Sequence, residues 1–480
     1  MKKIFIRVKG IDLHYILTIF LEYFSLILTI FLVLVVLSKR KEARATLAWV
    51  ILIIFLPYFG AILYIIFGNP RLKMIERKLK RKADIKYSIT SEVTDEYKTC
   101  MIGNQVTKIN GISPYLCSNL EFLNSASIKY TKLAEDILAA KEYILLEYYV
   151  FRQDETGKFF LNLLTKKLKD GVKVYLLYDG VGAIGLTLKR TLKRFKENGG
   201  KAAAFLSPFN VKFFTRVNFR NHRKVAIIDG KICYLGGINI GNEYIGDLLK
   251  GSDWIDAHIR FSGEAVVSIL ELFVEDWFFT TGEDISDVIK RPELNMKGDT
   301  SVHLLPSGPN EELSMIYSSL FALISGAKKN INILTPYLVP DEPILELLKF
   351  TARKGVEINI VCPGKNNHPF VAAAGRSYYE DLLKNGVNIY ETSNTMLHAK
   401  IITVDDRITL IGSANIDYRS FKLNFELSAL IYKERFTENV LRFIDKYKSE
   451  SILISTERIK NKRIHLKIYE SVCRTLSPVL

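Results

Sequence analysis

The stretch His222-Arg223-Lys224-Val225-Ala226-Ile227-Ile228-Asp229 decides the fold, because it occurs again as His398-Ala399-Lys400-Ile401-Ile402-Thr403-Val404-Asp405. Both copies read His, any residue, Lys, four further residues, Asp. Each copy leads to an asparagine after a small-residue turn, Asn239 after Gly236-Gly237 and Asn415 after Gly412-Ser413. A lone His-x-Lys usually marks an ordinary surface strand. Two copies with the same flanks, 176 residues apart, indicate a duplicated unit.

Strands and helices alternate on both sides of the two copies, from about residue 115 onward. Several strands are almost continuously apolar, which is typical of a buried parallel sheet. We therefore predict a duplicated α/β domain. Helices are expected at 127–141, 157–169, 186–198, 313–327, 343–354 and 377–385, and strands at 143–151, 172–178, 225–228, 331–335, 356–361 and 387–390.

Composition limits the partners and the compartment. The chain has 480 residues, of which 48% are hydrophobic, and a formal charge of +16. That charge suits a polyanionic partner, either nucleic acid or anionic lipid, and composition alone does not separate the two. The five cysteines are scattered with no Cys-x-x-Cys, and the seven histidines are not clustered with them. This pattern favours a reducing compartment and argues against a zinc site.

Two apolar runs at the N-terminus, 15–37 and 46–67, are each long enough to cross a membrane as a helix. We expect a transmembrane helical hairpin, although Pro57 and Gly60 leave a re-entrant second segment open. A cleaved signal peptide is less favoured, because the first run is too long and a second follows it. Basic residues before the first run and after the second predict that both ends face the cytoplasm.

A basic stretch follows the hairpin, from Arg71 to Lys82, with Leu72, Ile75 and Leu79 at helical spacing. One interpretation is a helix lying on anionic headgroups, and the other is a solvated linker helix. We favour the first because the membrane segments are adjacent. The expected organisation is a hairpin at 1–70, a basic interfacial linker at 71–110, two half-domains at 111–290 and 291–465, and a tail at 466–480.

The paired motifs carry the chemistry expected of a phosphodiester site. Within each copy, His and Lys at positions i and i+2 point to the same face of a strand. Two imidazoles, two ammoniums and two amides around one space could stabilise the oxygens of a phosphodiester. One imidazole could attack phosphorus and form a phosphohistidine, while the other protonates the leaving oxygen. No metal is required, because the candidate residues His222, Lys224, His398 and Lys400 supply the charge and the proton transfer.

The neighbouring polar residues receive supporting roles. Asn239, Asn415 and Ser413 are candidates for binding the substrate phosphate. A carboxylate is needed to fix the tautomer of each histidine. Glu426, 28 residues after His398, and Asp256, at the matching place after His222, are proposed for this task. The motif acids Asp229 and Asp405 end their strands, and we expect them to hold the turn rather than move protons.

Other histidines and one glycine-rich stretch receive structural interpretations. His258 and His303 are expected to be structural, whereas His368 lies in a polar loop and could touch substrate. Gly180-Val181-Gly182-Ala183-Ile184-Gly185 has the spacing of a dinucleotide loop, but two predicted elements precede it and no suitable acidic residue follows. A bent loop near the active site is the better interpretation.

The paired His-x-Lys-x4-Asp motifs with a following Gly-x-x-Asn resemble the phospholipase D superfamily. Further segments, and the N-terminal hairpin, resemble bacterial cardiolipin synthases over nearly the whole chain. These segments are Asn221-His222-Arg223-Lys224, Gly236 to Gly241, Thr335-Pro336-Tyr337, Gly412 to Asn415, Arg419-Ser420-Phe421 and Glu470 to Pro478. The resemblance implies a duplicated α/β/α sandwich with a pseudo-two-fold active site.

The resemblance also implies a reaction without a cofactor, in which two phosphatidylglycerols give cardiolipin and glycerol. It makes His222 the nucleophile and His398 the general acid and then base. Gly237 stands where the second half has Ser413, so the halves are not equivalent. Competing hypotheses are a membrane-bound phospholipase D or another phosphatidyltransferase, a non-catalytic lipid-binding protein, and a nuclease of the superfamily, which the hairpin disfavours. A phenylalanine-rich stretch at 208–220 is interpreted either as a membrane-dipping loop or as a packed wall of the pocket.

Overall fold

The computed structural model describes residues 7–8, 11–38, 43–68, 93–188, 190–209, 218–246, 254–289, 298–309, 314–393 and 395–475. The chain forms two compact units, residues 1–71 with 209–218, and residues 72–208 with 219–480. The predicted basic helix at 71–82 lies outside the described residues. Most of the phenylalanine-rich stretch does too, so neither of its two interpretations is decided.

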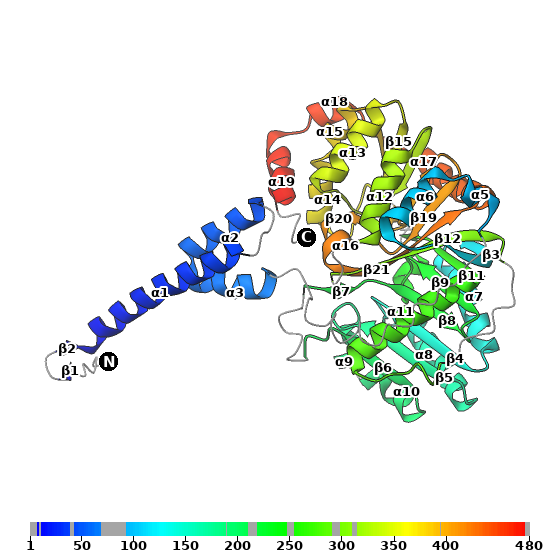
Figure 1. Cartoon of the computed structure of the whole chain (residues 1–480), viewed down its shortest axis with the longest axis horizontal. Helices are drawn as coiled ribbons and strands as arrows, with labels where there is room; N and C mark the ends of the chain where they lie inside the picture. Colours follow the sequence, from blue (N-terminus) through cyan, green and yellow to red (C-terminus); the bar gives the residue numbers. More distant parts are fainter. Residues whose placement is uncertain are drawn as a thin grey trace. The chain divides into compact units, whose positions relative to one another are not determined.

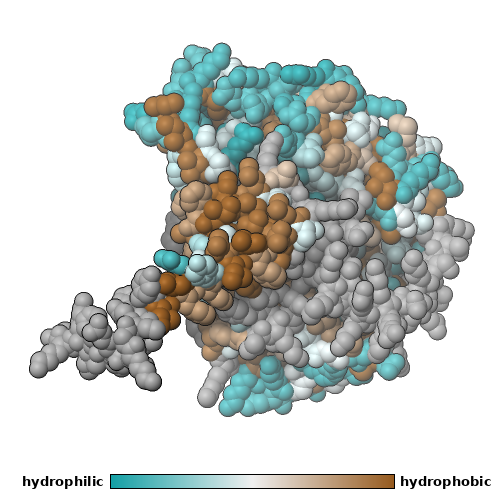
Figure 2. Space-filling model, turned by 60° about the vertical axis from the view of Figure 1, so that its left-hand side comes forward, coloured by the Kyte–Doolittle hydropathy of each residue, from teal (hydrophilic) through white to brown (hydrophobic). Residues whose placement is uncertain are grey.

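The N-terminal unit contains one long helix and two short ones (Figure 1). A two-residue ribbon, β1 (Arg7–Val8) with β2 (Ile11–Asp12), precedes α1 (Leu13–Ser38). The part of α1 from Ile16 to Ser38 is apolar and long enough to cross a membrane. Leu32, Val36, Ile53 and Tyr64 form a small buried cluster among the helices. The face of this unit that Figure 2 shows is mostly hydrophobic, and many large apolar side chains of α1, α2 and α3 are exposed.

The second apolar run is divided into two helices in the region of Pro57. It forms α2 (Ala43–Phe55) and α3 (Pro57–Phe67), which are separated at Leu56. Pro57 is the reason, because its ring disfavours a helical conformation at the preceding residue, and Leu56 has φ −135° and ψ 71°. At ~1.5 Å per residue, neither short helix alone matches the ~30 Å of a bilayer core.

The second unit is built on one large mixed sheet that runs through both halves of the duplication (Figure 1). Its strand order is β22-β16-β15-β13-β18-β19-β21-β12-β3-β11-β9-β8-β4-β5-β6. The antiparallel pair β12–β3 joins the second half to the first. The strands are β3 (Tyr115–Leu123), β4 (Tyr143–Tyr148), β5 (Lys173–Asp179), β6 (Lys201–Phe205), β8 (Lys224–Ile228), β9 (Ile232–Gly236), β11 (His258–Gly263), β12 (Thr300–Ser307), β13 (Asn330–Leu334), β15 (Glu357–Pro363), β16 (Val387–Thr392), β18 (Ile401–Val404), β19 (Ile408–Gly412), β21 (Asn424–Tyr432) and β22 (Ser451–Leu453).

The predicted duplication is confirmed strand by strand. Strands β4, β5, β6, β8, β9 and β11 of the first half correspond in order and pairing to β13, β15, β16, β18, β19 and β21. Turns repeat as well: Gly171 and Gly355 have φ of +86° and +98°, and Gly199 and Gly386 have +90° and +89°. These backbone angles favour glycine, which explains why the sequence repeats it at both places.

Helices cover both faces of the sheet, as the predicted sandwich requires. Strand β5 is buried on both faces: Val174 and Leu176 point into a core with α7 and α8, whereas Tyr175 meets Trp277 of α11 at 5.1 Å between ring centroids. The helices of the first half are α7 (Ala126–Ala139), α8 (Glu155–Lys169), α9 (Ile184–Leu188), α10 (Lys193–Glu197) and α11 (Glu264–Thr281), with the 3-10 turns η1 (Arg190–Leu192) and η3 (Asn242–Ile245).

The second half repeats this arrangement around its own core, with α17 holding the place of α11. Its helices are α12 (Met315–Gly326), α13 (Glu342–Arg353), α14 (Pro369–Arg376), α15 (Tyr379–Lys384), α16 (Tyr418–Lys422), α17 (Glu434–Ser449), α18 (Thr456–Lys460) and α19 (Ile464–Thr475). The helix expected at 186–198 is instead divided among α9, η1 and α10.

Two of the expected boundaries need correction. Residues 93–110 are not part of a linker: α5 (Asp95–Lys98) and α6 (Met101–Asn110) belong to the second unit, where Tyr97, Ile102 and Val106 are buried in the core of the second half. The expected tail at 466–480 instead begins within α19, an ordered helix up to Thr475.

Candidate active site

Two short parallel strand pairs connect the halves and bring the motifs together. β7 (Arg220–Asn221), just before His222, pairs with the start of β21 in the other half. β17 (Met396–Leu397), just before His398, pairs with β10 (Trp254–Ile255). As a result the His222 N–H donates to the Phe425 carbonyl (2.8 Å), and the His398 N–H donates to the Ile255 carbonyl (2.7 Å).

Each histidine therefore lies beside the carboxylate that follows its partner strand in the other half. His222 Nδ1 lies 3.0 Å from both carboxylate oxygens of Glu426, and His398 Nδ1 lies 2.8 Å from Asp256 Oδ2. Each carboxylate accepts a hydrogen bond from a protonated Nδ1, which leaves the Nε2 lone pair of each imidazole available. The two carboxylates singled out in the sequence are thus brought to the histidines, but the pairs are crossed between the halves.

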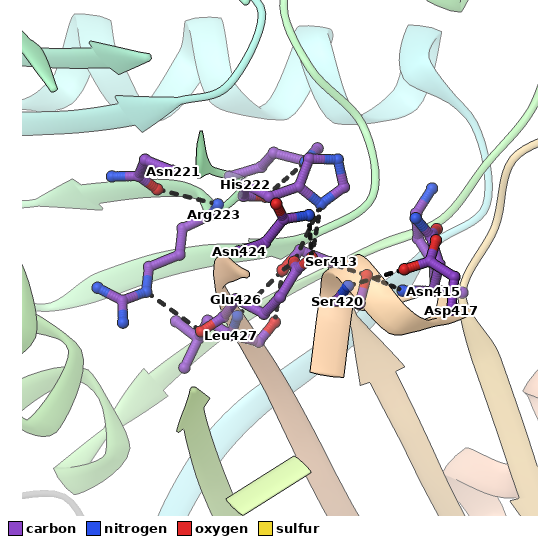
Figure 3. A network of polar contacts seen from close by, with 12 residues as sticks. Asn221, His222, Arg223, Ser413, Asn415, Asp417, Ser420, Asn424, Glu426 and Leu427 are labelled. Carbon is purple, nitrogen blue, oxygen red and sulfur yellow. Dashed lines mark hydrogen bonds and ion pairs between the residues drawn. The ribbon is translucent and has the colours of Figure 1, made fainter. Parts of the chain in front are cut away.

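Glu426 is held by several donors besides His222 (Figure 3). Ser413 Oγ donates to Oε2, while Ser420 Oγ (2.9 Å) and Asn424 Nδ2 (3.2 Å) donate to Oε1. Burial alone would raise the pKa of Glu426, but its interactions with His222 and Lys224 and the hydrogen bond from Ser413 outweigh it, and the pKa is lowered. The carboxylate therefore stays ionised and fixes the ring of His222.

Asp256 is held in a different way, and Gly237 explains the difference. A Cβ on Gly237 would lie 2.1 Å from Asp256 Oδ1, so no side chain fits there while the carboxylate keeps its place. Asp256 accepts from the Ala257 N–H at 2.8 Å, and the Lys400 charge offsets the effect of burial, so that its pKa is also lowered. The Gly237/Ser413 difference noted in the sequence thus marks two unlike carboxylate environments.

Ser413 was predicted to bind the substrate phosphate, and the structure corrects this. Its side chain is fully buried, its hydroxyl donates to Glu426, and it accepts from the Leu427 N–H at 3.0 Å. The hydroxyl is thus engaged with the Glu426 carboxylate and the Leu427 backbone in this structure.

The two motif lysines contact the histidines that precede them by two residues. Lys224 Nζ donates to the His222 carbonyl, and Lys400 Nζ contacts both the carbonyl and the ring of His398. Burial lowers the pKa of Lys224 to about 7 and that of Lys400 to about 8, and the repulsion from Lys400 contributes to the lowering at Lys224. Two buried ammoniums on one site can attract an anionic ligand.

The histidines themselves are kept neutral in this state. Burial lowers the pKa of His222, although Glu426 opposes the effect. Burial and the charge of Lys400 lower the pKa of His398 to about 3, despite the hydrogen bond to Asp256. A neutral His222 is the form needed for nucleophilic attack. A neutral His398 must gain a proton before it can act as an acid.

The motif aspartates lie at the far ends of the same strands. Asp229 accepts from the backbone N–H groups of Lys141, Glu142 and Tyr143 at 2.8 to 2.9 Å. Asp405 accepts from those of Lys328, Lys329 and Asn330 at 2.7 to 3.2 Å. Both have positive φ, +52° and +53°. Strands β8 and β18 separate these carboxylates from the histidines, so their direct role is in the turn.

The two motif asparagines are buried but differ in their contacts. The side-chain carbonyl of Asn239 accepts from the Val150 N–H at 3.0 Å, and its Nδ2 donates to the Tyr244 hydroxyl at 2.9 Å. Asn415 accepts no such bond: its Oδ1 is buried without a hydrogen-bond partner among the described residues. The amide of Asn415 is therefore the less constrained of the two.

Aromatic rings that the motif analysis did not single out line the site. Tyr149 lies edge-on to His222 at 4.9 Å between centroids, and Trp254 and Tyr337 lie 5.1 and 6.3 Å from His398. The Tyr149 carbonyl and ring leave no room for a side chain at Gly182, which places the glycine-rich loop near the site, as expected. Only Tyr337 had a sequence signal, in Thr335-Pro336-Tyr337.

The remaining histidines fit the structural interpretation where they are buried. His303 bonds the Tyr432 hydroxyl (2.7 Å) and Thr107 (3.0 Å), and His258 Nδ1 lies 3.3 Å from the Ile238 N–H. His368 is exposed, with its ring 5.8 Å from that of Tyr337. Within the described ranges, no three His, Cys, Asp or Glu side chains converge in a way that could hold a metal ion.

A mixed sheet duplicated about one site, with two histidine–carboxylate pairs and two lysines, defines a phospholipase D-type protein. The sequence matches the family described as "Cardiolipin synthase, PLD-like domain" over residues 133–249 and 320–448. Residues 27–69 match the family described as "Phospholipase_D-nuclease N-terminal".

Curated relatives narrow the phospholipase D-type class to one family. The major cardiolipin synthase of Bacillus subtilis (strain 168) is 35% identical over 96% of this chain and 99% of its own length. The cardiolipin synthase of Staphylococcus aureus (strain Mu50) is 36% identical over 96% of this chain and 97% of its own. The chain therefore belongs to the cardiolipin synthase family. A crystal structure of phosphatidylserine synthase from Haemophilus influenzae has the same fold, with a TM-score of 0.61 at 17% identity, covering 78% of this chain and 99% of that one.

Proposed function

We propose that this chain is a phosphatidyltransferase that joins two phosphatidylglycerol molecules into cardiolipin and releases glycerol. The observation that carries the proposal is the pair of crossed dyads, His222–Glu426 and His398–Asp256, around two buried lysines. This arrangement provides a nucleophile, an acid and a positively charged pocket for one phosphodiester.

In the first step, His222 Nε2 attacks phosphorus, and the bond from phosphorus to the glycerol oxygen breaks. His398 gives its Nε2 proton to that oxygen, so that free glycerol leaves and a phosphatidyl-histidine remains. Lys224, Lys400 and the amides of Asn239 and Asn415 stabilise the charged oxygens. The anionic phosphodiester offsets the two ammoniums that depress the pKa of His398, and so favours the protonated form that the step needs.

In the second step, the acceptor is a headgroup hydroxyl of another phosphatidylglycerol rather than a water molecule. Now-neutral His398 removes the proton from this hydroxyl, and the oxygen attacks phosphorus and breaks the bond to His222. The bond energy is retained in the intermediate, so no nucleotide is required. His222 and His398 are only 9% and 7% exposed, which limits competition from water.

The site acts at a membrane, and we infer that its catalytic unit lies on the cytoplasmic side. The basic residues that precede α1 and follow α3 support this orientation by the positive-inside rule. A multi-pass arrangement, with α2 and α3 together forming the second pass, accounts for the charge distribution. Residues 71–82 would then lie on anionic headgroups.

The experiment that tests the reaction uses the purified full chain with phosphatidylglycerol vesicles. Cardiolipin and glycerol should form in equal amounts. Phosphatidate without cardiolipin would contradict the transferase proposal and support a hydrolase. A chain that binds the vesicles without turnover would support a lipid-binding protein instead.

The assignment of the nucleophile has its own test. The substrate in this test carries a good leaving group in place of glycerol. Its release should leave a trapped phosphatidyl group on the His398→Ala variant, but not on the His222→Ala variant. If His222→Ala retains the trapped group and His398→Ala does not, the two roles are reversed.

A further inference from the structure

The C-terminal helix α19 displays an apolar ridge to solvent. Ile464, Ile468 and Val472 follow one another at every fourth residue, and their side chains are 71%, 59% and 53% exposed. The opposite face of the helix packs onto the protein through Cys473, which is 1% exposed, and α19 lies along α14 (Figure 1). The helix α19 is therefore apolar on two faces, and the domain covers only one of them. The other face is available for contact with a partner surface.

Phe370 of α14 extends this apolar surface. It is 57% exposed, and its ring lies 6.4 Å from that of Tyr469 on α19, which is itself 43% exposed. Together, Ile464, Ile468, Val472, Tyr469 and Phe370 form what we call the α19 ridge.

The segment that carries the ridge has an excess of basic residues, although Arg458 and Arg474 lie 3.8 Å from Glu391 and Asp381. The segment that contains α18 and α19, residues 456–475, holds six Lys and Arg against two Glu. One of the two acids, Glu470, is tied to Lys462 by two contacts of 2.8 Å. Apolar side chains flanked by basic ones match the interfacial zone of an anionic bilayer, where the ridge enters the acyl boundary and the cations meet headgroups.

Two ring contacts lead from His398 to the start of the helix that carries Phe370. The ring of His398 lies 6.3 Å from that of Tyr337, the ring of Tyr337 lies 5.8 Å from that of His368, and His368 occupies the N-cap position of α14, two residues before Phe370. The α19 ridge is therefore next to the rim of the active site on the His398 side, where a second lipid alcohol would enter.

We propose that the α19 ridge is a membrane-contact surface that seats this rim of the active site on an anionic leaflet. A lipid could then pass from the bilayer to His398 along the rings of Phe370, His368 and Tyr337 without crossing bulk water. The occupant is the bilayer surface itself, rather than a second protein.

Fluorescence quenching tests the contact and does not depend on the reaction proposed above. The full chain carrying Ile468→Cys is labelled with an environment-sensitive dye and reconstituted in mixed phosphatidylglycerol and phosphatidylcholine vesicles. The native cysteines form a small background, since four are buried and Cys100 is half-buried, and unsubstituted protein measures it. Phe350→Cys on α13, where the native side chain is 64% exposed, is the matched control.

We expect the label at 468 to be quenched by doxyl lipids and to be protected from aqueous iodide at least several-fold relative to the label at 350. Equal iodide quenching at the two positions would overturn the proposal. Protection from both quenchers would also overturn it, because a second copy or the chain's own N-terminal helices would then cover the ridge. If doxyl lipids quench the label at 468 equally in pure phosphatidylcholine vesicles, the part of the proposal that requires an anionic leaflet is overturned.

A second measurement tests the functional consequence. Replacing Ile464, Ile468 and Val472 by Ser should lower turnover on vesicles by about fivefold or more, because three interfacial anchors are lost. Turnover on the same lipid in detergent micelles should stay unchanged. Ser at Phe350, Met101 and Leu138, which are similarly exposed, is the control. An unchanged vesicle rate in the ridge variant would overturn the role of the ridge in lipid delivery.

Discussion

At the scale of single residues, the two histidines differ through what surrounds their carboxylates. Glu426 receives two hydroxyls and an amide in addition to His222, whereas Asp256 lies directly against Gly237. The ring of His222 is thus fixed by a carboxylate that is itself held on several sides. This suits a nucleophile that must keep one orientation, while His398 must change its protonation state twice in a cycle.

The contact at Gly237 can be tested by exchange. Gly237→Ser should abolish most activity, because its Cβ would displace the Asp256 carboxylate and free the ring of His398. Ser413→Gly, the matched change in the other half, removes one hydrogen bond and leaves a small void, so we expect a milder loss. Turnover of both variants should be measured alongside their thermal unfolding. Equal activity in the two variants would contradict this account.

The crossed dyads predict which step each carboxylate supports. Glu426→Gln should lower kcat by about 10²- to 10⁴-fold with little change in KM, as expected when a histidine loses its orienting charge. It should slow the formation of the phosphatidyl-histidine. Asp256→Asn should slow both the formation of the phosphatidyl-histidine and the transfer of the phosphatidyl group to the acceptor lipid. Pre-steady-state release of glycerol separates the steps; identical burst kinetics in both variants would argue against separate roles.

The buried lysines predict a pH dependence. With pKa values of about 7 and 8 in the unoccupied site, Lys224 and Lys400 lose their protons as the pH rises from 7 to 9. A neutral amine attracts a phosphodiester anion less than an ammonium does. KM for phosphatidylglycerol should therefore rise over this range at constant ionic strength. A KM that is constant up to pH 9 would show that the bound lysines stay charged throughout.

At the scale of elements, β8 and β18 act as rigid spacers between a reactive end and a structural end. Each follows closely on its motif histidine and is followed directly by an aspartate in a left-handed turn conformation. The aspartate ties this turn to the start of the neighbouring antiparallel strand, β4 or β13, through three backbone N–H groups. This bond set fixes the strand that presents the histidine.

Replacing a motif aspartate should therefore affect stability first. Asp405→Ala removes several charge-assisted bonds and should lower the free energy of unfolding by about 2–4 kcal/mol. Asp405→Asn, which tolerates the left-handed turn, should lower it less. Denaturant unfolding of the full chain in detergent measures both. If Asp405→Ala unfolds normally but is inactive, the aspartate has a direct role in the reaction after all.

At the scale of the whole molecule, one site is completed by residues from both halves. Each half supplies the carboxylate for the histidine of the other, and the sheet continues through β12 and β3 between them. The two halves therefore form a single functional unit, although each has its own apolar core.

This arrangement predicts the result of mixing inactive chains. Co-expressed His222→Ala and His398→Ala chains should remain inactive, because every molecule contains one damaged dyad within its own site. Cardiolipin formed from labelled phosphatidylglycerol is the readout, with co-expressed unsubstituted chain as the positive control. Recovered activity would mean that halves are exchanged between copies.

The sequence by itself determined the duplication and the class of chemistry, and it proposed the residues that carry it. The repeated spacing of His, Lys and Asp, and the repeated Gly171/Gly355 and Gly199/Gly386 turns, depend on local periodicity and backbone preference, which a sequence records directly. The break at Leu56 was less certain, because a proline in an apolar run can kink a helix or end it.

Only the tertiary structure decided how these residues are paired. The crossing of His222 with Glu426 and of His398 with Asp256 depends on β7 meeting β21 and β10 meeting β17, contacts between strands about 140 to 200 residues apart. The reassignment of Ser413 from substrate to carboxylate follows from the same packing. Strands of two residues are too short to show a hydrophobic periodicity, so no pattern in the sequence predicts them.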